Sequence, residues 1–173
     1  MKEIPKGESI KSAPSNVEAE EAMLGSILQG GDVEMEIAMA WIREDEAMYS
    51  TKCMQVFQCM KEMYNNKIPI DTITLSDTMM DKYGVRDTVY LMDLEDRSPS
   101  KVKVEHYARI VWERYVQRET TKSAQELLNA SYDNYNEVGK IIENHSRLIE
   151  ELRHIQPSKS RDISDIVEET NVA

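Results

Sequence analysis

Histidine and cysteine are the side chains best suited to metal binding or nucleophilic catalysis, and this sequence has few of them. The three histidines, His106, His145 and His154, form no H-x-x-x-H pair, and the two cysteines form no C-x-x-C pair. Cys53 and Cys59 are six residues apart, roughly 9 Å along a helix, which is too far for a disulfide. We therefore expect reduced core cysteines, no metal site and no catalytic residue.

The sequence also lacks the phosphate loop of many ATPases. None of its six glycines belongs to a G-x-x-x-x-G-K-[ST] motif, so no cofactor is expected in this chain. A small metal-free hydrolase using His106 or His145 with nearby acids is the enzymatic alternative, but no third group is placed to orient either imidazole. His145 lies on an apolar stripe, as is typical of a packed or interface histidine. Binding or assembly is the favoured class of function.

One carboxylate, Glu20, has an unusual predicted position. At about 100° per residue it falls within the apolar arc of a helix. The other members of this arc are Val17, Met23, Leu24, Ile27 and Leu28. Burying a carboxylate costs several kcal/mol unless it is paired. We predict that Glu20 is a structural anchor that ties the first helix to the base of a long helix through Arg109 or Arg114.

The spacing of apolar residues predicts an all-α fold. Helices are expected over residues 16–29, 32–42, 51–64, 74–83, 87–96, 101–130 and 136–154. Ser15 and Glu18 are expected to cap the first helix, and Gly30–Gly31 to end it. The segment ASYDNYN, residues 130–136, is expected to be a turn between two long antiparallel helices.

These helices predict four regions along the chain. A flexible arm covers residues 1–13, a globule of about five to six helices covers 14–100, and a protruding helical hairpin covers 101–155. A linker and the start of another helix cover 156–173. That last helix is short and marginally stable alone, so its apolar residues are expected to dock on a partner. They are Ile163, Ile166 and Val167.

The net charge of −11 makes a large nucleic-acid footprint unfavourable, since an acidic chain repels phosphate. Between Lys101 and Lys122 there are six bases against three acids, a pattern typical of a solvated, ion-paired helix face. DNA contact is therefore expected to be weak or indirect. No apolar run reaches 18 residues, so no membrane span is expected, and the cysteine usage favours the cytoplasm.

Several motifs, in order, resemble the N-terminal domain of DnaB-type replicative helicases. The stretch PSNVEAEEAMLGSIL is similar to the family's opening segment, and PIDTITL and SPSKVKVEHYARIV are similar to later ones. The matching residues are Pro14, Asn16, Glu18-Ala19-Glu20, Leu24-Gly25, Tyr49, Val56, Phe57, Pro69 to Leu75, Tyr90-Leu91, Leu94, Pro99-Ser100, Tyr107-Ala108, Ile110 and Val111. Departures occur at Met48 (usually Phe), Cys53 (usually His) and Asp87-Thr88 (often Gly-Gly). They indicate a diverged member, for which a phage or a plasmid is an expected source.

The resemblance implies a non-catalytic collar domain. In the family, N-terminal domains pair through their helical hairpins, and three pairs form a collar on a hexameric ring that recruits primase and, in some systems, a loader. ATP and magnesium would belong to the ATPase domain of the parent, a 5'-3' DNA helicase. The residues expected at the pairing interface are Leu127, Leu128, Val138, Ile141, Ile142, His145, Leu148, Ile149 and Leu152.

Two related interpretations stay open from the sequence. The chain could be the helicase-binding domain of a primase, which has a similar fold, although the segment PSKSRDISDIVEET favours the helicase. It could also be a truncated regulator that forms mixed collars with a helicase.

Overall fold

The fold is seen in a computed structural model that describes residues 12–98, 103–133 and 135–154. Side chains are described for these residues except 133, 135–138 and 151–154. Most of the predicted arm, the predicted linker, and Ile163, Ile166 and Val167 therefore lie outside the described residues.

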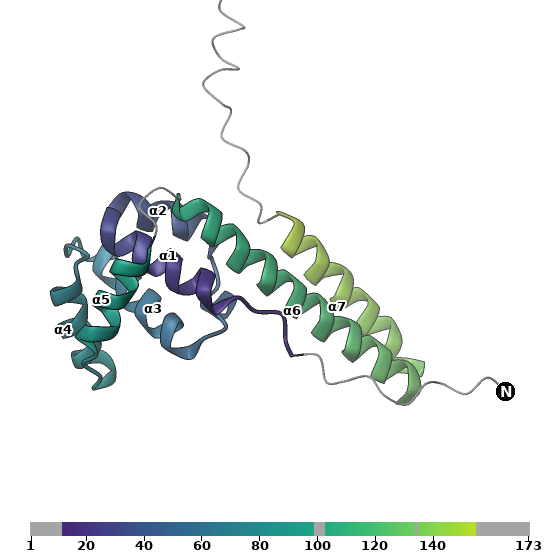
Figure 1. The fold of residues 1–173 in the computed structure, drawn as a ribbon. Coiled ribbons are helices and arrows are strands. Elements are labelled where there is room, and N and C mark those ends of the chain that lie inside the picture. The colour runs from purple at the N-terminus through teal and green to yellow at the C-terminus, as the bar shows by residue number, and fades with distance from the viewer. Residues whose placement is uncertain (1–11, 99–102, 134, 155–173) are drawn as a thin grey trace, which may run out of the picture.

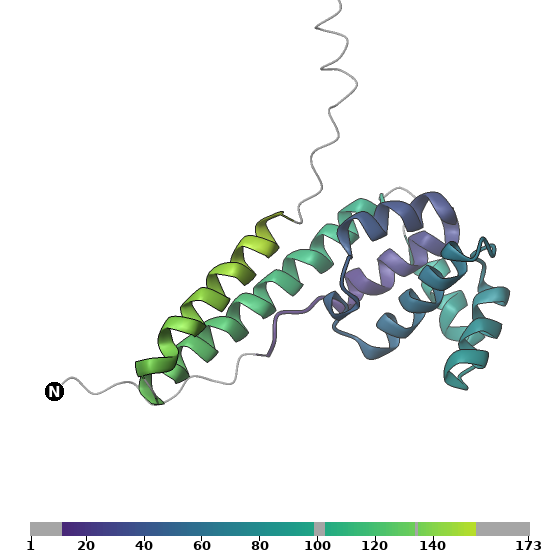
Figure 2. The same cartoon turned by 180° about the vertical axis from the view of Figure 1, so that it is seen from behind.

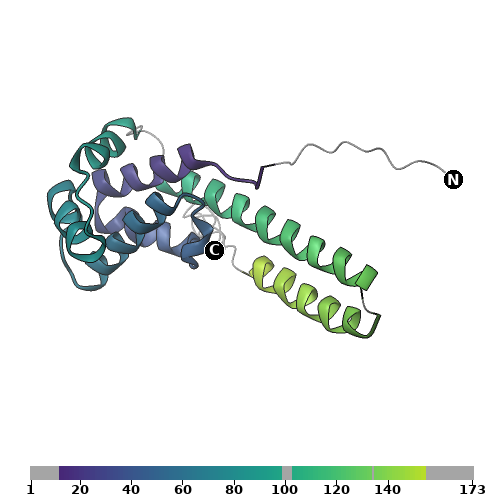
Figure 3. The same ribbon diagram turned by 90° about the horizontal axis from the view of Figure 1, so that it is seen from below.

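The prediction of an all-α fold is confirmed. Helices α1 to α5 gather into a globule, and the long α6 runs out of it with α7 alongside (Figure 1). The same arrangement is seen from behind and from below (Figures 2 and 3). The helices are α1 (Val17–Gly30), α2 (Asp32–Trp41), the short 3₁₀ helix η1 (Asp45–Ala47), α3 (Thr51–Asn65), α4 (Thr72–Tyr83), α5 (Thr88–Arg97), α6 (Val104–Asp133) and α7 (Tyr135–His154).

The core of the globule is formed mainly by aliphatic and sulfur-containing side chains. Phe57 is the single phenylalanine of the chain and is fully buried at its centre. Methionines fill much of the remaining volume, as suits a flexible side chain that adapts to irregular gaps. The buried methionines are Met23, Met35, Met48, Met60, Met63 and Met79. Cys53 and Cys59 are free and buried, as expected.

The start of α1 differs from the prediction. Asn16, not Ser15, is the N-cap, and its side chain accepts a 3.0 Å hydrogen bond from the backbone N–H of Ala19. Asn and Ser cap equally well, so the choice depends on where the chain turns into the helix. The predicted end of α1 is confirmed: Gly31 has φ +68°, a conformation that glycine adopts without a steric penalty.

Gly25, in the middle of α1, allows close packing against α5. A Cβ atom built on Gly25 would lie 2.0 Å from the carbonyl oxygen of Leu94. Only a residue without a side chain leaves room for this approach, so Gly25 fixes the distance between α1 and α5.

The two hairpin helices lie closer together along the chain than predicted. α6 continues to Asp133 and α7 begins at Tyr135, so most of the predicted turn over residues 130–136 is helical. Ser131 Oγ donates to the carbonyl of Leu127 over 2.7 Å, which lets a serine stay within a helix. No helix in the described parts of the chain combines the length and apolar character needed to cross a membrane.

Candidate interaction sites

The carboxylate of Glu20 is 1% exposed and lies between α1 and the start of α3. Its Oε1 accepts the backbone N–H of Tyr49 at 2.7 Å, and its Oε2 accepts that of Ser50 at 3.0 Å. Ser50 is itself the N-cap of α3, because its hydroxyl accepts the N–H of Cys53. Glu20 is therefore buried and paired, as predicted, and holds α1 against the first turn of α3.

Burial raises the pKa of Glu20, and four nearby groups oppose that rise. They are the backbone N–H groups of Ser50 and Tyr49, the positive charge of Arg118, and the thiol of Cys53. The donors satisfy the carboxylate oxygens, which makes the burial tolerable.

The predicted arginine partners of Glu20 are wrong. Arg109 lies 3.8 Å from Glu113 in an exposed ion pair one helical turn away, and Arg114 donates to the side chain of Gln117 at 2.8 Å. Both residues use local partners on α6, because neither falls on the face of α6 that meets α1 and η1. The backbone N–H groups of the loop before α3 replace them.

Arg118 is the arginine that joins α6 to the globule, and it was not among the predicted site residues. Its guanidinium donates to the carbonyl oxygens of Pro14 at 2.9 Å, Glu46 at 3.1 Å and Ala47 at 2.8 Å. It also lies 5.4 Å from the ring centroid of Tyr49. A guanidinium presents five N–H donors in a fixed fork, so one side chain can hold three carbonyls and an aromatic ring together.

A signal for Arg118 was present in the sequence. Val104, Ala108 and Val111 are buried on one stripe of α6, and Tyr115 continues it as a partly buried residue. Arg118 follows Tyr115 by three residues and therefore falls on the same stripe. A basic residue on an apolar stripe indicates a partly buried cation that needs acceptors.

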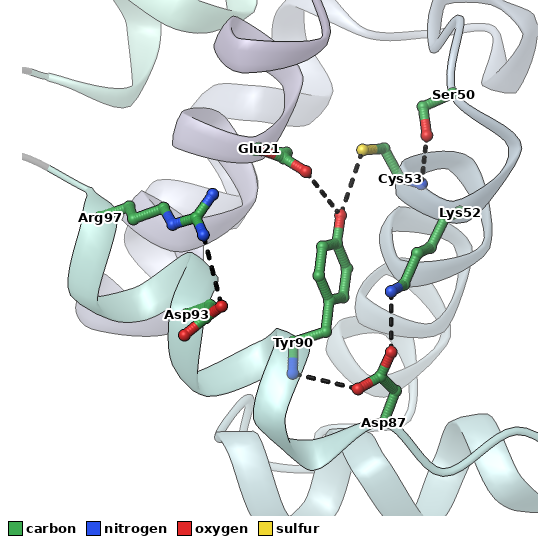
Figure 4. A network of polar contacts seen from close by, with 8 residues as sticks. All are labelled: Glu21, Ser50, Lys52, Cys53, Asp87, Tyr90, Asp93 and Arg97. Carbon is green, nitrogen blue, oxygen red and sulfur yellow. Dashed lines mark hydrogen bonds and ion pairs between the residues drawn. The ribbon is translucent and has the colours of Figure 1, made fainter.

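A second polar network, around Tyr90, joins α1, α3 and α5 (Figure 4). The Tyr90 O–H donates to Glu21 Oε1 at 3.3 Å, so the thiol of Cys53, 3.5 Å away, is left to donate to the phenol oxygen. Asp87 caps α5 by accepting the N–H of Tyr90 at 3.1 Å and also pairs with Lys52 at 2.7 Å. Burial raises the pKa of Tyr90, which keeps the phenol protonated.

Two of the departures from the family pattern meet in this network. Cys53 and Asp87 are two of the positions at which the sequence departs from the motifs that it resembles. Both contact Tyr90, which matches the family pattern. The two departures therefore belong to one polar network around Tyr90 and not to two separate sites.

The hairpin formed by α7 and the second half of α6 carries the predicted pairing residues. Ser123 of α6 is buried and forms a hydrogen bond with Nδ1 of His145 of α7. His145 thus lies in the contact row between the two helices. Leu127, Ile141, Leu148 and Ile149 are partly buried.

The remaining predicted pairing residues differ in exposure. Leu128 is 49% exposed and Ile142 is 50% exposed. Val138 and Leu152 belong to α7 by their backbone, but their side chains lie outside the described part of the structure.

Leu128 and Ile142 lie on the same side of the hairpin. At 100° per residue, Leu128 is rotated by about 140° around α6 from Ser123. Ile142 is rotated by about 60° around α7 from His145, in the same sense. In antiparallel helices, equal senses of rotation away from the contact row lead to the same side of the pair. Ile149 falls on that side as well. The hairpin therefore presents an apolar strip, which we define as Leu128, Ile142 and Ile149.

Among the described residues, no group of three or more His, Cys, Asp and Glu side chains lies close enough together to hold a metal ion. His106 stacks edge-on against Tyr107 at 5.7 Å between ring centroids, and among the described residues no carboxylate is bonded to it.

Comparison with known proteins gives a consistent result. The family model for the DnaB-like helicase N terminal domain matches residues 12–113. The chain is 26% identical over 161 residues to the replicative DNA helicase DnaB of Geobacillus stearothermophilus, and 31% identical over 130 residues to that of Buchnera aphidicola. These alignments cover 91% and 73% of this chain, but only 35% and 27% of the two relatives.

The fold is also found among solved structures. The crystal structure of the N-terminal domain of DnaB helicase from Mycobacterium tuberculosis matches with a TM-score of 0.70 at 17% sequence identity. The match covers 81% of this chain and 99% of that one. The resemblance inferred from the ordered motifs is thus confirmed, and because the family model covers more than half of its length, the chain belongs to the DnaB-like helicase N-terminal domain family.

Proposed function

We propose that this chain is the non-catalytic N-terminal domain of a hexameric replicative DNA helicase, and that its hairpin pairs subunits into a collar. The observation that carries the proposal is the apolar strip on one side of the hairpin. Leu128 and Ile142 are each about half exposed there, although α6 and α7 already pack on one another. Family membership supports the same reading, since the named relatives are replicative helicases.

The strip supplies a modest but specific driving force. Fully burying one large aliphatic side chain contributes about 1.5–3 kcal/mol, and half-exposed residues contribute less. A symmetric pair uses each residue twice, because both copies present the same surface. Association also costs orientational freedom, so the isolated pair is expected to be weak. In the collar, three such pairs would be held together by the ring of the parent protein.

The catalytic and partner-binding parts of the proposal concern the parent protein. ATP and magnesium would bind its ATPase domain, and the 5'-3' unwinding of DNA would be performed there. Primase, and in some systems a loader, would dock on the collar. The acidic character of the chain, with a net charge of −11, supports weak or indirect contact with DNA. The helicase names of the relatives favour this reading over a primase domain.

Sedimentation velocity over a range of concentrations tests the pairing. The parent chain should form dimers or larger species, and the double variant Leu128→Lys/Ile142→Lys should shift to monomer, because paired copies would bring lysines together. Val89→Lys/Met92→Lys, with the same charge change on an exposed part of α5, is the matched control and should pair like the parent. A strict monomer at high concentration that also fails to bind the primase of the same genome would overturn the proposal.

A further inference from the structure

Exposed large apolar side chains are concentrated on α4 and α5, at the end of the globule away from the hairpin (Figure 1). Five of the thirteen such residues in the described part of the chain fall within residues 73–92, so they form a group rather than isolated exposures. They are Ile73, Met80, Val85, Val89 and Met92. Ile73 and Val89 are each 72% exposed, although both belong to regular helices.

Helical spacing places four of these residues on two aligned faces. On α4, Ile73, Asp77 and Met80 follow i, i+4, i+7 spacing. On α5, Val89, Met92 and Asp96 follow i, i+3, i+7 spacing. Each helix therefore presents two apolar residues and one acid on one face.

Two hydrogen bonds show that these faces are neighbours. Thr72 Oγ1 donates to Glu95 Oε2 at 2.9 Å, and the hydroxyls of Ser76 and Thr88 are 2.9 Å apart. Because the later residue of α4 bonds to the earlier residue of α5, the two helices are antiparallel. The four bonded residues mark the row along which α4 and α5 contact each other. From that row the apolar residues of both helices are displaced in the same rotational sense, so they project to the same side. We call this surface the α4–α5 face.

The charges around the α4–α5 face are mainly negative. Residues 72–97 contain six acids and three bases. Each base is already paired with a carboxylate: Lys82 with Glu62, Arg86 with Asp77, and Arg97 with Asp93. Asp96 lies on the face itself, is exposed, and has no ion pair among the described residues.

The apolar residues and the negative charge of the α4–α5 face together indicate which kind of partner could bind there. A second copy of the chain would bring two acidic faces together, and like charges across an interface are unfavourable. A membrane surface with anionic lipids is disfavoured for the same reason. An apolar surface formed by two neighbouring antiparallel helices suits another helix that lies along it. The acids beside this surface suit basic side chains that flank the apolar stripe of that helix.

We propose that the α4–α5 face is a docking site for a basic amphipathic helix of another protein. The apolar stripe of that helix contacts Ile73, Met80, Val89 and Met92, and its Lys or Arg side chains pair with Asp96, since Asp77 is already paired with Arg86. The proposal goes beyond the pairing function and does not depend on it, because the hairpin lies at the other end of the molecule.

A synthetic helix tests the site directly. The probe is a peptide of about 18 residues, five helical turns, with Leu at i, i+3, i+4, i+7 spacing and Lys on both flanks. Its binding to the full 173-residue chain is followed by fluorescence anisotropy and by backbone amide shifts of the ¹⁵N-labelled chain. Shifts are expected on α4 and α5. A peptide with the same leucines and Glu on its flanks should bind at least about tenfold more weakly.

Paired variants separate this site from the hairpin. Val89→Lys/Met92→Lys should weaken binding of the Lys-flanked peptide by about tenfold or more, whereas Leu128→Lys/Ile142→Lys should leave it unchanged. Circular dichroism checks that both variants remain helical. The proposal is overturned if the peptide binds both variants equally, if the shifts fall elsewhere, or if Val89→Lys/Met92→Lys abolishes self-association instead. The first two outcomes leave pairing through the hairpin untouched, whereas loss of self-association in Val89→Lys/Met92→Lys would count against that pairing as well. The Leu128→Lys/Ile142→Lys variant tests the pairing separately.

Discussion

Glu20 in α1 accepts the backbone N–H of Ser50, the residue that caps α3, over 3.0 Å. The other oxygen of the same carboxylate accepts the N–H of Tyr49. One side chain thus satisfies two loop donors, and it holds the cap of α3 in place. A residue that looks out of place on an apolar arc is the link between two helices.

Removing this carboxylate should destabilise the fold. Glu20→Ala removes the acceptor of two backbone N–H groups, each bonded to a charged group, so the free energy of unfolding should fall by about 2–4 kcal/mol. Glu20→Gln keeps one acceptor oxygen and should cost less. Urea unfolding followed by circular dichroism measures both. Glu36→Ala, at an exposed position of α2, is the control and should change stability by no more than about 0.5 kcal/mol; an equally small effect of Glu20→Ala would contradict the anchoring role.

The stability difference between the parent and Glu20→Gln should depend on pH. Burial raises the pKa of Glu20 above its ordinary 4.5, so folding favours the protonated acid. That contribution is fully present below the unfolded pKa and is lost as the pH rises through the folded pKa. The advantage of the parent over Glu20→Gln, measured by urea unfolding, should therefore shrink as the pH rises above the ordinary pKa of 4.5 and through the raised pKa of the folded state. An advantage that grows with pH would show that the pKa is lowered instead.

Asp71, the N-cap of α4, should show the opposite pH dependence. Its carboxylate accepts the backbone N–H groups of Thr74 and Ile73, each at 2.9 Å. The bond from Thr74 is the main reason why the pKa of Asp71 is lowered from 3.8. Asp71→Ala should cost about 1 kcal/mol at neutral pH. The deficit should disappear as the pH falls through the folded pKa, and Asp71→Asn, which can still cap, should be milder.

Gly25→Ala and Gly139→Ala should change stability in opposite directions. The new Cβ at Gly25 would meet the carbonyl of Leu94, so α1 and α5 must separate, at a cost of about 1–3 kcal/mol or more. At Gly139 in α7, nothing lies within 4 Å of the new Cβ. Alanine there should stabilise the helix by about 0.5–1 kcal/mol. Thermal unfolding of both variants is a direct comparison, and similar shifts in Tm would refute the close approach at Gly25.

Arg118 should be required for the joint between the hairpin and the globule. Arg118→Ala removes donors to three carbonyls and should lower the free energy of unfolding by about 2–4 kcal/mol. Arg118→Lys keeps the charge but cannot reproduce the fork, so an intermediate loss is expected. Arg109→Ala is the matched control on the same helix, since its one ion pair is exposed. Equal losses at positions 109 and 118 would contradict this assignment.

Local patterns in the sequence were enough to predict most of the helices. The glycine stop after α1, the start of α3 at Thr51 and the stripe of Val104, Ala108 and Val111 are each encoded within a few residues. The family followed from short motifs in order, which are also local. Errors occurred where two local choices were nearly equal in energy, as with Ser15 and Asn16 at the first cap.

The sequence by itself determined the helical class, the family and the burial of Glu20, because periodicity and capping act between near neighbours. Only the tertiary structure decided what Glu20 and Arg118 contact. Glu20 binds backbone groups 29 and 30 residues away, and Arg118 reaches a carbonyl 104 residues away. Backbone N–H and C=O groups are present at every residue, so no residue type marks the ones that a folded chain will bring to a buried charge.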